Sequence, residues 1–168
     1  QEACKSLAEA RHRPDLTRCE LVKIMSSSTR PRLRGIHLSG SDLEGLDLSD
    51  LCMDYSQLQE ATLDNAFLAR TTLKGAQLTG ASLLGADLTD CDLRDTIFDS
   101  AALKGAIFSG CRLQGASLSD VDLEGVSLKG VDLEGANLEG VKLGGVDLDE
   151  ANLNHVDLSD RNMSKASM

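Results

Sequence analysis

The sequence predicts a solenoid, a fold in which one short structural unit stacks many times on itself. Each position from Leu33 to Met163 whose number ends in 3 or 8 is Leu, Phe or Met, so a five-residue register runs through 27 consecutive units without insertion or deletion. The residue two places before each is mostly small, and 14 of the 15 glycines end a unit. A period of five fits neither an α-helix nor a simple strand, and such persistence indicates a repeat architecture.

The composition of one unit explains why the units must stack. Two of its five side chains are apolar or small and three are polar or Gly, so one unit cannot bury its apolar pair, whereas stacked units can. We expect Leu33, Leu38 and their successors to fill the interior, with the small residues beside them. An aromatic content of 2% fits a narrow interior. Gly, Asn and Asp suit tight turns, and the non-glycine corners of this kind are Asp50, Asn65, Asp90, Asp95 and Asp120.

Units such as ADLTD, CDLRD, ANLEG and VDLEG resemble the repeat of the pentapeptide-repeat family, Ala/Val-Asp/Asn-Leu-x-Gly. The resemblance covers residues 31 to about 166. It implies an all-β solenoid, namely a right-handed, four-sided parallel β-helix with one pentapeptide per side and four per coil. Residues 20 apart would then stack on each other, and residues 31–168 would make about seven coils.

Residues 1–30 precede the repeat and predict a short helical cap, separate from the repeat domain of residues 31–168. Residues 2–11 have a helical composition, and residues 14–27 follow as a second helix. Thr17 and Glu20 have capping-box spacing. We expect an apolar stripe that covers the first coil and its open backbone edge; docking on a partner is the alternative. The stripe would consist of Leu16, Cys19, Val22 and Met25.

A narrower resemblance spans Pro14 to Ser49. PDLTRCELVKIM followed by TRPRLRGIHLSGSDLEGLDLS resembles the junction in BTB-domain proteins that carry pentapeptide repeats, relatives of the potassium-channel-tetramerisation-domain group. Members of that kind act as substrate adaptors for cullin-3 ubiquitin ligases. The resemblance implies a substrate-recognition module whose cullin-3 contact lies in a domain outside this chain. The chain begins with Gln1 rather than Met, which is compatible with a fragment or a processed form.

The charge of the chain is acidic and uneven. The net charge is −10; residues 1–30 hold six Lys/Arg against four Asp/Glu, and the remainder holds 11 against 23, which gives +2 and −12. This acidity argues against binding nucleic acid through its phosphates. Three explanations of the acidic surface remain: it attracts a basic partner, it imitates DNA, or it only keeps the protein soluble. One predicted side mixes both signs, while the other three are mostly acidic or neutral; the mixed side carries Arg32, Arg34, Lys74, Arg94, Arg112, Asp54, Asp92, Asp132 and Glu134.

A few outward positions are apolar where the repeat favours polar residues. Phe67 and Ile107 would fall on one side, two coils apart, with Asp87 between them. Binding energy concentrates in a few buried anchors, although single exposed apolar residues are also common without function. The candidate partner contacts are therefore Phe67, Leu84, Ile97, Ile107, Arg94 and Arg112. Phe98 and Phe108 hold central positions, and we expect them to be interior.

Nothing in the sequence favours catalysis, a metal or a cofactor. The histidines, His12, His37 and His155, lie far apart and have no partners at metal-ligand spacing. No phosphate loop, dinucleotide fingerprint or nucleophile elbow is present. The five cysteines, an odd number without small-scaffold spacing, weakly favour a reducing compartment. Cys91 and Cys111 would stack about 4.8 Å apart; we interpret them as buried thiols, with a redox pair as the alternative.

The sequence shows no secretory signal and no apolar run near the ~20 residues of a membrane span, which predicts a cytoplasmic or nuclear location. We predict a non-enzymatic protein-interaction module, the partner-recognition part of a cullin-3 adaptor. One alternative is a DNA-mimicking inhibitor of a type II topoisomerase, as in the quinolone-protection branch of the family; another is a stand-alone repeat protein. Members of that branch usually dimerise through an apolar C-terminal helical tail, whereas this chain ends DLSDRNMSKASM. Because the last coil lacks an evident cover, we also expect end-to-end self-association.

Overall fold

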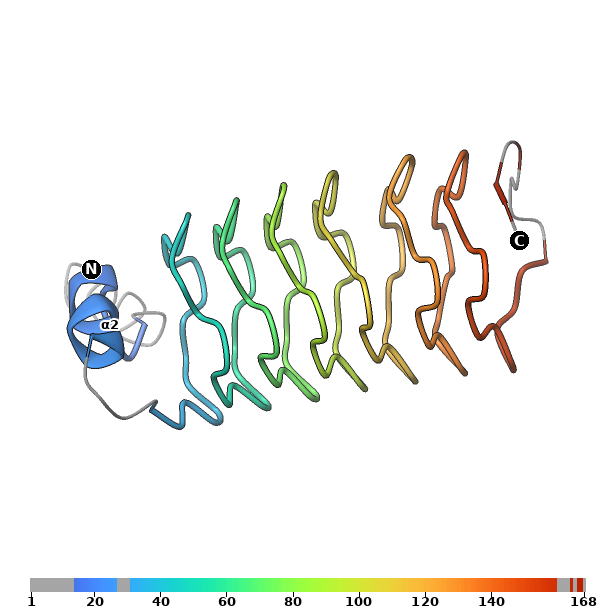
Figure 1. Cartoon of the computed structure of the whole chain (residues 1–168). Coiled ribbons are helices and arrows are strands. Elements are labelled where there is room, and N and C mark those ends of the chain that lie inside the picture. The colour runs from blue at the N-terminus through green and yellow to red at the C-terminus, as the bar shows by residue number, and fades with distance from the viewer. Residues whose placement is uncertain (1–13, 27–30, 160–163, 165, 168) are drawn as a thin grey trace, which may run out of the picture.

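The computed structural model describes residues 14–26, 31–159, 164, 166 and 167. Residues 31–159 wind into a stack of 20-residue coils, with the helix at one end of the stack and residues 153–159 at the other (Figure 1). The expected helix over residues 2–11 and part of the last coil lie outside the described residues. The coil count of about seven and the division at residue 30 therefore remain predictions.

The coils are joined by a parallel ladder in which residues whose numbers end in 2 or 7 pair with the residue 20 positions later. Thr72 pairs with Cys52 and with Asp92, for example. The Leu73 amide donates to the Asp92 carbonyl at 2.9 Å, and the Ala76 amide then closes a turn on the Leu73 carbonyl at 2.9 Å. Because this turn recurs every five residues, each side pairs through single residues. The described residues contain these isolated bridges and no longer strands.

The interior is filled by the central residues of the units. From Leu33 to Leu148 these side chains are at most 9% exposed, as predicted. Phe98 and Phe108 are both buried, and their rings meet edge to face with centroids 6.4 Å apart. Leu153 and Leu158, at the end of the stack, are only partly buried. The burial predicted from the five-residue register is thus confirmed, except where the described stack ends.

The corner residue, which ends each five-residue unit, adopts a left-handed backbone conformation whatever its type. Asp50, Asn65, Asp90, Asp95 and Asp120, the corners predicted from their short polar side chains, have φ values from 55° to 61°. Larger residues adopt the same conformation, which costs a non-glycine residue roughly 1–2 kcal/mol; examples are Tyr55, Glu60 and Arg70. The position of a residue in the repeat, and not its intrinsic preference, therefore sets the corner geometry.

The helix α2 spans Arg18–Met25 and begins with the predicted capping box between Thr17 and Glu20. The predicted apolar stripe was wrong in part. Leu21 is fully buried and Leu16 and Met25 are partly buried, whereas Cys19 and Val22 are exposed. With Thr17 as N-cap, Leu16 and Leu21 occupy the two positions of a hydrophobic staple, which turns the Leu21 face toward the solenoid.

Polar contacts hold this segment against the first coil. The Arg18 guanidinium donates to the Asp42 carbonyl at 3.3 Å, to the Asp42 carboxylate at 3.2 Å and to the Glu44 carbonyl at 2.7 Å. The Asp15 amide donates to the His37 carbonyl at 2.7 Å, and the His37 amide donates to the Asp15 carboxylate at 2.8 Å. Within the described residues, no helix has both the length and the apolar character needed to cross a membrane.

Candidate functional site

The outward side chains form four faces, defined by the central residues that they flank. Side A flanks residues 33, 53, 73 and onward in steps of 20; side B starts at 38, side C at 43 and side D at 48. The ladder bridges follow the same steps, so side chains 20 apart are neighbours on one face. The six predicted contacts fall on all four faces.

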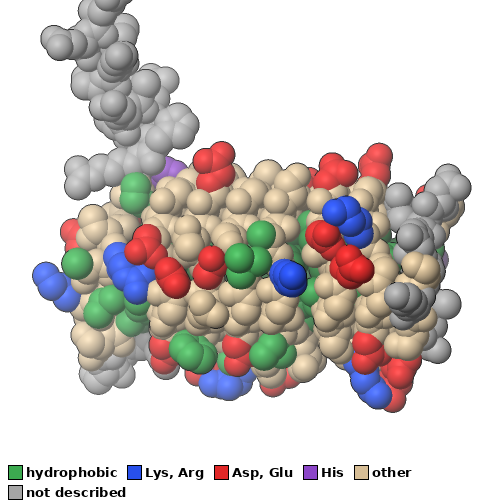
Figure 2. Space-filling model, turned by 90° about the horizontal axis from the view of Figure 1, so that it is seen from above, with side chains coloured by type: hydrophobic (Ala, Val, Ile, Leu, Met, Phe, Trp, Pro, Cys, Tyr) green, Lys and Arg blue, Asp and Glu red, His purple; other side chains and the backbone are tan. Residues whose placement is uncertain are grey.

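Side D carries a column in which acidic and apolar side chains alternate. Its members Asp47, Phe67, Asp87 and Ile107 bridge successively along the ladder. Phe67 is 53% exposed and Ile107 is 48% exposed. Figure 2 shows that exposed hydrophobic side chains lie beside acidic ones on the surface of the solenoid. We call these four residues the acid–apolar column.

Asp87, at the centre of the column, has no cationic partner among the residues that the structure describes. Its Oδ1 atom accepts hydrogen bonds from the Thr89 amide at 3.0 Å and the Thr89 hydroxyl at 2.6 Å. Among the described residues, no Lys or Arg forms a salt bridge with this carboxylate. The column therefore presents a half-buried negative charge between two exposed apolar side chains.

Leu84 lies on side C, around the corner from the column. It is 40% exposed and borders a shallow hollow of about 260 Å³. The hollow mixes apolar residues with charges of both signs, and it is lined by Leu84, Ala102, Leu103, Lys104, Asp122 and Glu124. Leu84 is thus the apolar wall of a depression and not a projecting anchor.

The hollow coincides with a loosened part of the backbone ladder, which we call the ladder opening: Ala102 still bridges to Asp122, but no bridge joins Ile107 to Ser127. The Gly85 amide donates to the Lys104 carbonyl at 3.0 Å and the Ile107 amide to the Ala86 carbonyl at 3.0 Å, but no backbone hydrogen bond of normal length joins residues 103–110 to residues 122–130. The yellow and orange coils are correspondingly more widely spaced in Figure 1. The coil before the opening holds both Phe98 and Phe108, and we attribute the separation to the larger volume of these two rings.

Arg94 and Arg112 lie on side A and share one acidic partner. Arg94 forms a bidentate pair with Asp92, at 2.8 Å and 2.7 Å, and Arg112 adds a third bond at 2.9 Å. Asp92 is only 7% exposed. Hydrogen bonds from Arg94 and the charge of Arg112 hold the pKa of Asp92 below its ordinary value. The guanidinium groups of Arg94 and Arg112 are therefore already paired with an acidic residue of the solenoid itself.

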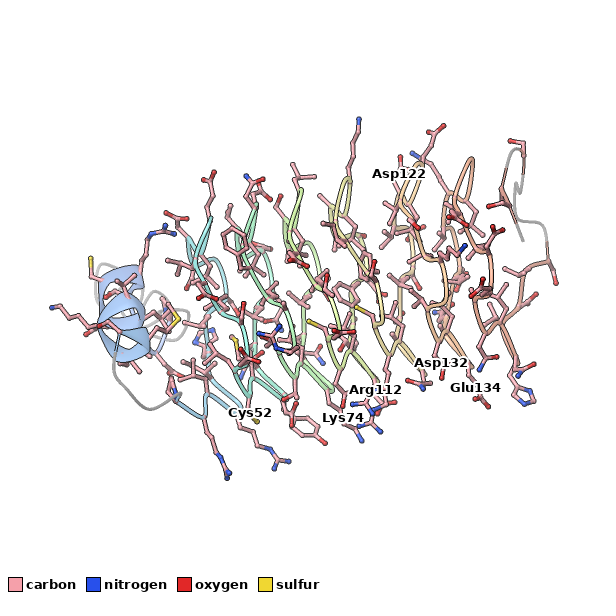
Figure 3. The ribbon with its side chains drawn as sticks, viewed as in Figure 1. Cys52, Lys74, Arg112, Asp122, Asp132 and Glu134 are labelled. Atoms are coloured by element: carbon pink, nitrogen blue, oxygen red, sulfur yellow. The ribbon has the colours of Figure 1, made fainter. Side chains whose placement is uncertain are left out.

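The rest of side A is also balanced in charge. Figure 3 shows Lys74, Arg112, Asp132 and Glu134 along this side, with Asp122 on the opposite one. The Lys74 ammonium lies 3.8 Å from the Asp95 carboxylate. The Arg34 guanidinium stacks 4.9 Å from the centre of the Tyr55 ring, a contact that the sequence reasoning missed. The only sequence signal for it was an aromatic residue at a corner normally held by Gly or Asp.

Ile97 lies on side B and is only partly exposed, apart from the other candidates. Of the six predicted contacts, Phe67 and Ile107 share side D and are separated by Asp87, while Arg94 and Arg112 both pair with Asp92. Within the part of the chain that the structure describes, no group of three His, Cys, Asp or Glu is placed to hold a metal ion.

Cys91 and Cys111 are buried free thiols. Their sulfur atoms donate to the carbonyls of Leu68 and Leu88, each at 2.9 Å. The neighbouring Cys111 side chain and burial raise the pKa of the Cys91 thiol. A thiol such as Cys91, held protonated and away from solvent, reacts slowly. The burial of both residues favours their interpretation as small interior side chains.

The repeat agrees with a known sequence family. The model of the pentapeptide repeats matches residues 56–95, 96–135 and 132–168, which is more than half of the chain. The chain belongs to the pentapeptide repeat family. No curated protein sequence matches it. None of the comparisons supports the resemblance of Pro14–Ser49 to BTB-domain proteins, so the cullin-3 adaptor hypothesis has no support from them.

Two solved structures with TM-scores above 0.5 show the same fold. Two trypsin-treated variants of QnrB1, described as a plasmid-mediated fluoroquinolone resistance protein, are 20% and 19% identical, with TM-scores of 0.54 and 0.52. In each case the match covers 83% of this chain, and it covers 84% and 85% of the QnrB1 chains. A pentapeptide repeat protein from the Arabidopsis thaliana thylakoid lumen is 26% identical over 73% of this chain and 72% of its own, with a TM-score of 0.37.

Proposed function

We propose that this chain is a non-enzymatic module that binds another protein through the acid–apolar column on side D. The observation that carries this proposal is the exposure of Phe67 and Ile107 on either side of Asp87. The Asp87 carboxylate pairs with no Lys or Arg of the described residues. Covering the exposed half of each apolar side chain would contribute about 1 kcal/mol.

The ladder makes this face suitable for binding. The Phe67 amide donates to the Leu46 carbonyl at 2.9 Å, and the Ile107 amide to the Ala86 carbonyl at 3.0 Å. The backbone of the column is therefore fixed before any partner arrives. A preorganised surface loses less conformational entropy on binding than a flexible loop does, so even a few anchors can give a specific interaction.

The same proposal assigns α2 the role of a cap. Burial of Leu21 and the three hydrogen bonds of Arg18 to the first coil support this role. A cap would cover the backbone edge that an open coil otherwise offers to another chain. End-to-end pairing through the C-terminal coil, and a cytoplasmic or nuclear location, remain predictions.

A second candidate function is inhibition or protection of a type II topoisomerase. The net charge of −12 over residues 31–168 favours a surface that resembles DNA, and QnrB1, which has the same fold, is a fluoroquinolone resistance protein. However, side A neutralises much of its own charge through Asp92, Arg94 and Arg112. A DNA supercoiling assay with gyrase, a type II topoisomerase, and micromolar protein tests this candidate function. An unchanged rate of supercoiling would dismiss it.

Partner capture from an extract of the source cells tests the main proposal. The bait variant Phe67→Asp/Ile107→Asp places two charges on side D, and the control Gln57→Asp/Ile97→Asp places two charges at the same two-coil spacing on side B. We expect the wild type and the control to retain the same specific proteins and the side D variant to lose them. Retention by the side D variant, or loss only in the control, would contradict the proposal.

A further inference from the structure

The spacing of the acid–apolar column indicates what kind of partner segment it fits, an inference that rests on the proposed function. Adjacent coils of a parallel ladder lie about 4.8 Å apart. Asp47, Phe67, Asp87 and Ile107 occupy four successive coils, so the column extends roughly 14 Å along the solenoid axis, with its acidic and apolar members about 4.8 Å from each other.

An α-helix lying along the axis matches this spacing. A helix rises 1.5 Å per residue, so residues i, i+3, i+7 and i+10 lie about 0, 4.5, 10.5 and 15 Å along its axis, close to the column steps of about 0, 4.8, 9.6 and 14.4 Å. Those four positions share one helix face. An extended strand presents a side chain on one face only every 6.6–6.8 Å or so. Its side chains therefore fall out of register with the column residues after two steps.

The residues beside the column leave room for a helix. The second outward row on side D consists of small side chains, namely Ser49, Ala69, Thr89 and Ser109. Small residues allow a helix to approach a surface closely, since interaxial distances depend on the side chains at the contact. No Lys or Arg stands in either outward row of side D between residues 47 and 109. Arg70, at the corner beside these rows, is held by the Asp50 carboxylate at 2.7 Å and 2.8 Å.

Charge complementarity specifies the composition of the helix. Within the described residues, the Asp87 side chain accepts hydrogen bonds from the neutral Thr89 groups through Oδ1, which leaves its Oδ2 atom for a cation from outside. The net charge of −10 would also draw a basic segment toward the chain. We propose that the column binds an amphipathic α-helix of a partner protein whose contact stripe alternates basic and apolar residues, basic at i and i+7 and apolar at i+3 and i+10.

A designed peptide tests this inference. A fluorescently labelled 21-residue helix, about three heptads long, carries Lys at each i and i+7 position, Leu at each i+3 and i+10 position, and Ala and Gln elsewhere. Fluorescence anisotropy measures its affinity for the full chain. The control peptide has the same composition in an order that places Lys and Leu on different faces.

We expect the designed helix to bind at least tenfold more tightly than the reordered control. The Phe67→Asp/Ile107→Asp variant should lose at least tenfold in affinity, Asp87→Asn about threefold, and Gln57→Asp/Ile97→Asp almost nothing. Equal binding of both peptides, or undiminished binding to the side D variant, would overturn the helix assignment. If the peptide result is negative while the side D variant still loses its cellular partners, the interaction surface stands and only the helix is wrong.

Discussion

Two glycine corners allow the stacking of side chains at the corners to be measured. Gly130 and Gly140 have similar positive φ values, 65° and 69°. A Cβ atom at residue 130 would have no atom within 4 Å, whereas one at residue 140 would lie 3.1 Å from the Asp120 Cγ and 3.3 Å from its backbone nitrogen, and closer still to its Oδ1. Substituting Ala at each position therefore separates backbone strain from a side-chain clash.

The expected magnitudes follow from these two contributions. The left-handed conformation costs Ala roughly 1–2 kcal/mol. Ala also makes the unfolded chain less flexible than Gly does, which lowers the entropy cost of folding and offsets about 0.4–1 kcal/mol of that strain. Gly130→Ala should thus destabilise the protein by about 1 kcal/mol. Gly140→Ala must also displace the Asp120 side chain, at a further cost of roughly 0.5–1.5 kcal/mol for an off-rotamer arrangement, for a total of about 2 kcal/mol.

Urea denaturation followed by far-ultraviolet circular dichroism measures these differences. In the Asp120→Ala background the Gly140→Ala cost should fall back to about 1 kcal/mol, which gives a coupling of about 1 kcal/mol in a double-mutant cycle. The reasoning fails if the two glycine substitutions destabilise equally, or if removing the Asp120 carboxylate leaves the cost of Gly140→Ala unchanged.

Two further predictions concern the ionic cluster and the ladder opening. The folded pKa of Asp92 lies below its unfolded value, so its stabilising contribution is present above the unfolded pKa of about 3.9 and is lost as the pH falls through the folded pKa. Asp92→Asn should therefore lose less stability than the wild type between pH 5 and pH 3 in thermal melts; parallel losses would contradict this. In hydrogen exchange, we expect the backbone amides at the ladder opening to exchange at least tenfold faster than the equivalent amides one coil earlier, and equal rates would refute the opening. The amides at the opening are those of Leu103, Gly105, Phe108 and Gly110. The amides one coil earlier are those of Leu83, Gly85, Leu88 and Asp90.

The sequence was sufficient for features that repeat with the unit. Burial of the central leucines, stacking at 20-residue steps and the polar corner residues all follow from a register that never shifts. The Thr17–Glu20 capping box was also predictable, because it depends on residues only three apart. The placement of Phe67 and Ile107 on one face followed from the same arithmetic.

Features that depend on packing between coils could not be predicted. The sharing of Asp92 by Arg94 and Arg112 depends on rotamers and not on position in the repeat. The ladder opening has no signal in the five-residue register, and we attribute it to the fit of the Phe98 and Phe108 rings within one coil. The face that α2 turns inward was predicted incorrectly, because the helical stripe alone did not reveal that Leu21 would meet the first coil.

Site-specific photo-crosslinking tests the central claim most directly. Benzoylphenylalanine in place of Phe67 or Ile107 samples side D, and the same substitution at Gln57 or Ile97 samples side B of the same coils. The account predicts discrete crosslinked proteins in an extract of the source cells from residues 67 and 107, with no equivalent species from residues 57 and 97. Crosslinks from side B with none from side D would contradict the claim that the acid–apolar column is where this solenoid meets its partner.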